Sequence, residues 1–165
     1  MKKLIIMATT LVLLPFLGNA QSKSLKNIYK TYDKQDDAVN INISGNILNM
    51  FNWYNNDEKD EDLEKIAKAV TSLRIFSVSK GKEGMDKLAM RRFRKSIQAE
   101  DFEDLMTIRN ADGNFYVMVK ERNGIVKDLV MYGEGEDGNF FLELLGSMKA
   151  RKVAKFMNNI EVDSI

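Results

Sequence analysis

The sequence predicts an α+β domain with a largely antiparallel sheet, a C-terminal four-strand meander and helices packed on it. One observation is that segments with apolar residues at helical spacing alternate with short strand-like segments before residue 102. Another is that four strand-like runs then follow one another, separated by Asp112-Gly113, Asn123-Gly124 and a Gly-rich stretch at residues 133–138. Asn-Gly and Asp-Gly supply the positive φ angles that tight hairpin turns require. Helices and antiparallel strands that segregate along a chain in this way are typical of the α+β class.

The N-terminus has the pattern of a secretory signal peptide. Lys2 and Lys3 precede an apolar run over residues 4–17, and the small residues Gly18 and Ala20 stand three and one positions before Gln21. The run is too short for a membrane span, which needs about 20 apolar residues. We therefore expect residues 1–20 to be a signal peptide that is cleaved after Ala20, and residues 21–165 to form a single α+β domain.

The composition limits the location and the partners of the mature chain. The sequence contains no Cys, so it has neither disulfides nor the lipid-accepting Cys that would follow the leader of a lipoprotein. We expect a soluble protein in the periplasm or outside the cell, without a transmembrane anchor. Removal of Lys2 and Lys3 turns the formal charge of +1 into −1, because no other charged residue lies in the leader. This balance argues against nucleic acid as a partner.

The first elements of the mature chain are a helix and a strand. The helix is expected over residues 24–34, with Ser24 as its N-cap. The strand is expected over residues 39–44 with one face buried, since apolar and polar residues alternate there. A turn or short helix is expected over residues 45–56. The apolar positions that define the helix are Leu25, Ile28, Tyr29 and Tyr32, and those of the strand are Val39, Ile41 and Ile43.

Two further helices flank a second strand. Acidic residues favour a helix start near residue 57, and the helical spacing continues to residue 73. A strand is expected over residues 74–79 and a helix over residues 83–100. The residues expected to face inward are Leu63, Ile66, Ala67, Val70 and Leu73 in the first helix, and Met85, Leu88, Ala89, Phe93 and Ile97 in the second.

The meander strands are expected over residues 103–110, 115–122, 125–132 and 139–146, and a last helix over residues 149–160. A two-residue hairpin at Asn123-Gly124 would pair Met118 with Leu129 and Tyr116 with Met131. These four residues would then share one apolar face, which is a possible ligand or partner surface. The favoured alternative is that a helix of the same chain covers this face.

The Gly-rich stretch "GEGEDG" fits the G-x-G-x-x-G pattern of dinucleotide-binding proteins, which needs a βαβ unit and a helix after the last glycine. Here it lies late in a meander, and the carboxylates of Glu134, Glu136 and Asp137 would repel a pyrophosphate. We expect a hairpin connector. Weak calcium binding by these acids stays open, because calcium prefers clustered carboxylate oxygens.

The sequence assigns no catalytic residue, cofactor site or metal site. Without His and Cys the chain lacks the commonest general base, thiol nucleophiles and the usual zinc ligands. A pair of carboxylates could still serve a glycosidase, but no pair stands out from the surface charge. We expect a protein that is not an enzyme.

The stretches "SLRIFSVSKG" and "FEDLMTIRNADGNFYVMVKERNGIVKDLVMYGEGEDGNFFLELLGSM" resemble the domain of unknown function 4252 family, which is common among exported proteins of Bacteroidetes. The resemblance implies an envelope or secreted setting and supplies neither an activity nor site residues. Many members resemble lipoproteins, and this chain departs from them by lacking the Cys. We expect a binding or interaction module of the cell envelope, with an unknown envelope protein as its partner. The alternative is a carrier or chaperone for an apolar ligand such as a lipid.

Overall fold

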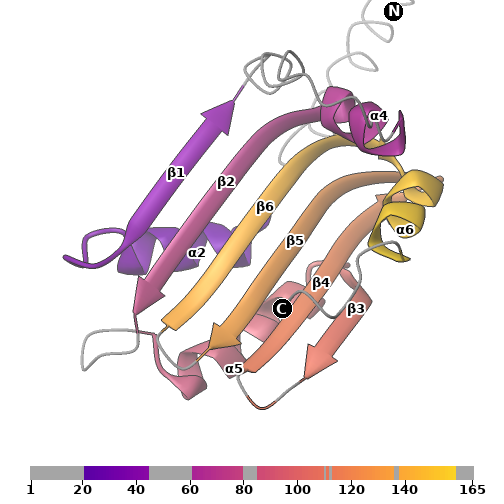
Figure 1. The fold of residues 1–165 in the computed structure, drawn as a ribbon. Coiled ribbons are helices and arrows are strands. Elements are labelled where there is room, and N and C mark those ends of the chain that lie inside the picture. Colours follow the sequence, from indigo (N-terminus) through magenta and orange to yellow (C-terminus); the bar gives the residue numbers. More distant parts are fainter. Residues whose placement is uncertain are drawn as a thin grey trace, which may run out of the picture.

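A six-stranded antiparallel sheet forms the centre of the protein, with the strand order β1-β2-β6-β5-β4-β3 (Figure 1). The computed structural model describes residues 21–44, 61–79, 85–109, 111, 113–135 and 138–158. The mixed α and antiparallel β class predicted from the sequence is confirmed. The elements are α2 (Lys23–Tyr32), β1 (Val39–Ser44), α4 (Glu61–Ala69), β2 (Val70–Ser79), α5 (Lys87–Gln98), β3 (Glu103–Arg109), β4 (Gly113–Arg122), β5 (Ile125–Gly135), β6 (Gly138–Lys149) and α6 (Ala150–Asn158).

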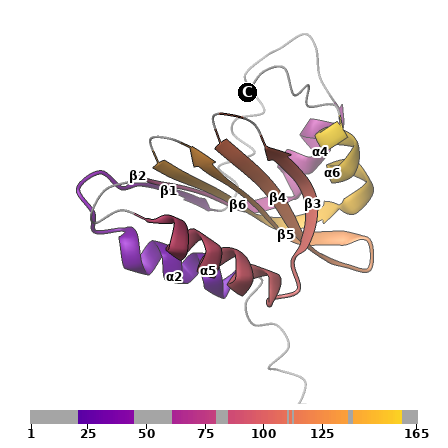
Figure 2. The same cartoon turned by 90° about the horizontal axis from the view of Figure 1, so that it is seen from below.

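The helices cover the two faces of the sheet unequally. Helices α2 and α5 lie side by side along one face, whereas α4 and α6 pack at one end of the other (Figures 1 and 2). The first face holds the larger core, in which Phe93 of α5 meets the rings of Tyr132 and Phe141 edge-on at 5.1 and 5.2 Å between centroids. The smaller core includes Ile66 of α4 and Val153 of α6. Among the described helices, none crosses the middle of the second face.

Side-chain caps fix where α2 and α5 begin. Ser22, and not the expected Ser24, is the N-cap of α2, because its side chain accepts a hydrogen bond from the backbone N–H of Leu25. Asp86 caps α5 in the same way through the N–H of Ala89. Ser24 lies inside the first turn of α2 instead.

Two expected helices differ from the structure. The helix expected to continue to residue 73 ends at Ala69, and Val70 already belongs to β2. The β-branched pair Val70 and Thr71 favours a strand over the helix that the spacing suggests. Leu88 was expected to face inward but is 52% exposed, since α5 begins only at Lys87 and its inward face carries Met90, Phe93 and Ile97. The segment expected as a turn or short helix, residues 45–56, lies outside the described residues.

The expected register of β4 against β5 is wrong by one residue. Met118 pairs with Val130 rather than with Leu129, and Val119 pairs with Leu129. The shift arises because one residue of β5, Lys127, has no partner in β4, which is the pattern of a β-bulge. The expected pairing assumes a regular ladder on both sides of the Asn-Gly turn. Because of the extra residue, every β5 residue beyond the bulge lies on the opposite face of the sheet from the expected one.

No described helix of the chain is long and apolar enough to cross a membrane.

Candidate functional site

The four residues predicted to form one surface lie on two faces of the sheet. Tyr116 and Met118 are buried in the core beneath α2 and α5, with exposed fractions of 4% and 0%. Leu129 is buried on the opposite face in the core beneath α4 and α6, and Met131 packs half-buried at its border. These side chains therefore do not form a common ligand surface, and helices of the same chain cover Tyr116 and Met118.

An apolar surface does exist, on the side of the second face away from α4 and α6. Strand β1 was expected to bury one face, yet Val39 is 51% and Ile41 is 44% exposed. Ile41 pairs with Ile75 of β2, and Ile75 pairs with Leu142 of β6, so their side chains form a row across three strands. We call this surface the open apolar face. It comprises Val39, Ile41 and Ile43 of β1, Leu73 and Ile75 of β2, and Phe140 and Leu142 of β6.

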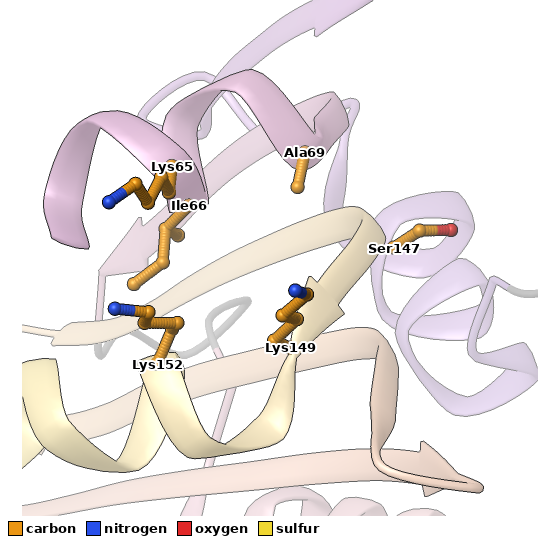
Figure 3. A pocket seen from close by; sticks show the side chains of 6 residues that line it. All are labelled: Lys65, Ile66, Ala69, Ser147, Lys149 and Lys152. Carbon is orange, nitrogen blue, oxygen red and sulfur yellow. The ribbon is translucent and has the colours of Figure 1, made fainter. Parts of the chain in front are cut away.

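A small cavity lies where α4 and α6 approach the end of β6. Its volume is about 270 Å³, and Ile66 and Ala69 provide apolar lining. Side chains of Lys65 and Lys152 extend toward the same side from α4 and α6, and Lys149 of β6 lies beside Lys152 (Figure 3). This volume is at the lower limit of small-molecule pockets, which have about 300–1,000 Å³. The lysine and apolar side chains of this lining suit a ligand in which an anionic group is attached to a short apolar segment.

The Gly-rich stretch forms the end of one strand and the start of the next. Strand β5 ends at Gly135, and Gly138 begins β6, with Glu134 paired to Asn139 across the hairpin. A strand therefore follows the last glycine, where the dinucleotide-binding pattern needs a helix. This agrees with the prediction that the stretch connects the two strands of a hairpin. Glu136 and Asp137 lie outside the described residues, and within the described part of the chain no group of three acidic side chains could hold a metal ion.

Buried carboxylates lie beneath the first turn of α2, and sequence reasoning did not find them. Asp128 of β5 is 0% exposed and Glu143 of β6 is 2% exposed, on the face that α2 and α5 cover. Oε1 of Glu143 accepts a hydrogen bond from the Ser22 backbone N–H at 3.4 Å, and Oε2 accepts one from Nε2 of Gln21 at 3.2 Å. A single charged residue inside an otherwise apolar strand, as in "NFFLELLG", is the sequence signal that could have pointed to Glu143.

A third carboxylate, that of Glu100, holds the same turn from outside the core. It accepts hydrogen bonds from the backbone N–H groups of Lys23 at 2.8 Å and Ser24 at 2.7 Å, and from the Ser24 hydroxyl. The N-terminus of a helix carries partial positive charge and N–H groups without helical partners. Glu100 and Glu143 thus fix the start of α2 to the rest of the domain.

Burial determines the protonation of this group. Burial first, and then the charge of Glu143, raise the pKa of Asp128 from 3.8 to about 8, while the nearby Ser22 N–H lowers it only in part. Burial also raises the pKa of Glu143, against hydrogen bonds from Gln21 and Ser22 and the charge of Arg74 on the neighbouring strand. Neither oxygen of Asp128 has a hydrogen-bond partner. At neutral pH the pair therefore holds fewer charges than its two carboxyl groups would carry in water.

A chain that retains residues before Gln21 is expected to lose stability as pH rises from about 4 to 8. In this range the folded state keeps a proton on Asp128 that the unfolded state releases, because the folded pKa is about 8 and the ordinary value is 3.8. In Asp128→Asn, the free energy of unfolding should fall by a few kcal/mol less over the same pH range than in the unsubstituted chain. Urea unfolding at pH 5 and pH 8 measures it, with the exposed Asp36→Asn as control. An unchanged pH dependence in Asp128→Asn would contradict the buried, protonated state.

The described part of the chain defines an α+β domain whose sheet is covered by helices on one face and only in part on the other. Residues 29–156 match the family described as Domain of unknown function (DUF4252), so the chain belongs to this family. The resemblance inferred from the sequence is thereby confirmed. Comparison with curated proteins and with solved structures found no match.

Proposed function

We propose that the protein is a non-enzymatic binding module that is exported to the periplasm or the cell exterior and contacts an envelope protein through the open apolar face. The observation that carries the proposal is the exposure of Val39 and Ile41, together with the apolar row that continues from Ile41 across β2 to β6. Contiguous apolar surface on a soluble domain is typical of interaction sites. Export rests on the leader pattern at residues 1–20.

The position of β1 favours a protein partner. This strand forms one edge of the sheet, and no described strand pairs with its outer side. An edge strand offers backbone N–H and C=O groups beside its side chains. A protein partner can use both, through an added strand and through apolar contacts, whereas a lipid can use only the side chains.

A carrier for an apolar ligand is the second candidate, and the cavity between α4 and α6 supports it. An acidic lipid head group would find Lys65, Lys149 and Lys152 at the cavity rim. The cavity is too small for a whole lipid, so the acyl chains would have to lie on apolar surface elsewhere on the domain.

Ile41→Lys is expected to abolish binding without unfolding the domain. Ile41 is 44% exposed, so a lysine there can reach water while it places a charge within the open apolar face. Leu88→Lys is the matched control, because Leu88 is 52% exposed on α5, which covers the other face. The measurement is isolation of the protein from its native envelope, followed by mass spectrometry of the proteins and lipids bound to it.

The outcomes separate the two candidates. A protein that is bound by the wild type and by Leu88→Lys but is lost from Ile41→Lys supports the interaction module. A lipid with the same behaviour supports the carrier. If the same molecules accompany all three proteins, the open apolar face is not the binding surface and the proposal is wrong.

A further inference from the structure

The carboxyl group of Asp128 is buried without a partner, which is costly unless something outside the described contacts satisfies it. Both of its oxygens are inaccessible and have no partner at hydrogen-bond geometry, and the Ser22 N–H that lies nearby donates to Glu143 instead. Buried polar groups in native proteins are almost always paired, so each exception calls for a physical explanation. A donor that carries a positive charge would satisfy the acceptors and the charge together.

When Asp128 is ionised, the carboxylates at this site outnumber the nearby cations. Glu143 approaches it from β6 and Glu100 from the end of α5, while Lys120 acts on it from β4. Arg74 of β2 lies beside Glu143, but its guanidinium stacks 4.6 Å from the centroid of the Tyr29 ring of α2. The Tyr29 hydroxyl is itself buried without a hydrogen-bond partner. The surroundings therefore suit one further cation that enters beside the start of α2.

Gln21 stands at this entrance. Its side chain donates to Glu143, and the next backbone nitrogen, that of Ser22, lies 3.4 Å from Oε1 of Glu143. Successive residues of a chain are at most about 3.6 Å apart along its axis, so the Gln21 nitrogen lies within about 7 Å of this carboxylate.

We propose that Asp128 and Glu143 form a binding site for the α-ammonium group that cleavage after Ala20 creates on Gln21. The inference rests on the export that the proposed function includes. Hydrolysis adds water across the peptide bond between residues 20 and 21, so that the leader departs with a carboxylate and the nitrogen of Gln21 becomes an amine that takes up a proton. The same nitrogen is a neutral amide before cleavage. Processing thus supplies the cation that the buried pair lacks and makes the mature domain more stable than its precursor.

The test compares chains that differ only at this nitrogen. The first begins at Gln21 with a free amine, and the second is identical but acetylated, which removes the charge. Mass spectrometry confirms the free amine, because an N-terminal Gln can cyclise with loss of its side-chain amide as ammonia. Cyclised material is removed, since it also lacks the Nε2 donor to Glu143. At pH 6.5 we expect the free chain to melt about 5 °C or more above the acetylated chain.

Asp128→Asn and Glu143→Gln together provide the matched control, since acetylation should then have no effect on the melting temperature. A second measurement is the pKa of the Gln21 amine, followed by NMR in the folded mature chain. Pairing with the carboxylates should raise it above the ordinary value of about 7.7–8.0. Equal melting of the free and blocked chains, or an amine pKa at or below the ordinary value, would overturn the proposal.

Failure of the export proposal is separable from failure of this site. N-terminal sequencing of the protein from its native source shows whether the chain begins at Gln21. A different start would refute the cleavage, while the purified chain that begins at Gln21 still tests whether the carboxylates bind the ammonium group.

Discussion

Met118→Asp is expected to unfold the domain. Met118 is 0% exposed in the core between β4 and the helices α2 and α5, where it is a member of an apolar cluster. An aspartate there would be charged without a partner or would have to be protonated at a high cost in free energy. The loss should be about 4 kcal/mol or more, a large part of the 5–15 kcal/mol by which domains are typically stable.

Circular dichroism melting measures this effect, and Val39→Asp is the control. Both substitutions replace an apolar residue of a strand by the same acid, but Val39 is 51% exposed at the sheet edge. We expect Val39→Asp to melt within a few degrees of the wild type. An unchanged melting temperature for Met118→Asp would show that helices do not bury this part of the sheet.

Gly146→Ala is expected to cost about 1–3 kcal/mol through a backbone clash. A Cβ atom at this position would overlap the carbonyl oxygen of Ala69 and would lie 3.0 Å from both the Ala69 carbonyl carbon and the Cα of Val70. These atoms form the junction between α4 and β2, where the antiparallel pairing of β2 with β6 shifts its register. The neighbouring atoms are backbone, so they cannot turn aside as the end of a long side chain could.

Gly133→Ala is the matched control because it makes the same chemical change in a neighbouring strand. The atoms nearest to its added Cβ would be the carbonyl oxygen of Asn114 at 3.6 Å and Cδ2 of Phe115 at 3.8 Å, which are ordinary contact distances. Its stability should equal that of the wild type or exceed it slightly, since alanine loses less entropy on folding. Urea unfolding compares the two variants, and equal stability would show that β6 does not pack against the α4–β2 junction as described.

The spacing of apolar residues predicted whether most segments are helices or strands. It predicted the boundary between adjacent elements less accurately. Ile66 and Val70 are spaced as on a helix, although the helix ends between them. Local spacing cannot show this boundary, because the pairing of Val70 with Gly146 on a distant strand determines it. The β-branched residues at the junction were the one local indication.

The candidate surface was misplaced for a similar reason. The assignment of Met118 and Leu129 to one face depended on regular pairing beyond the Asn-Gly turn, and the unpaired Lys127 breaks that regularity. Asp128 and Glu143 were missed because sequence reasoning treated isolated acids as surface charge. They lie beneath the first turn of α2, which is more than 100 residues away in the sequence; Ser22 and Glu143 are 121 positions apart.

The contacts of that first turn constrain the order in which the domain can assemble. Ser22 bonds to a residue 121 positions further along the chain, and β2 pairs with β6, which is the last of the described strands to be synthesised. A chain that is synthesised or threaded through a pore from its N-terminus thus holds the start of α2 without Glu143, and β2 without β6, until nearly all of it has emerged. Such non-local closure slows folding. Folding of this domain therefore awaits release of nearly the whole chain, and the β1–β2 strand pair is the part most exposed to premature association with other chains.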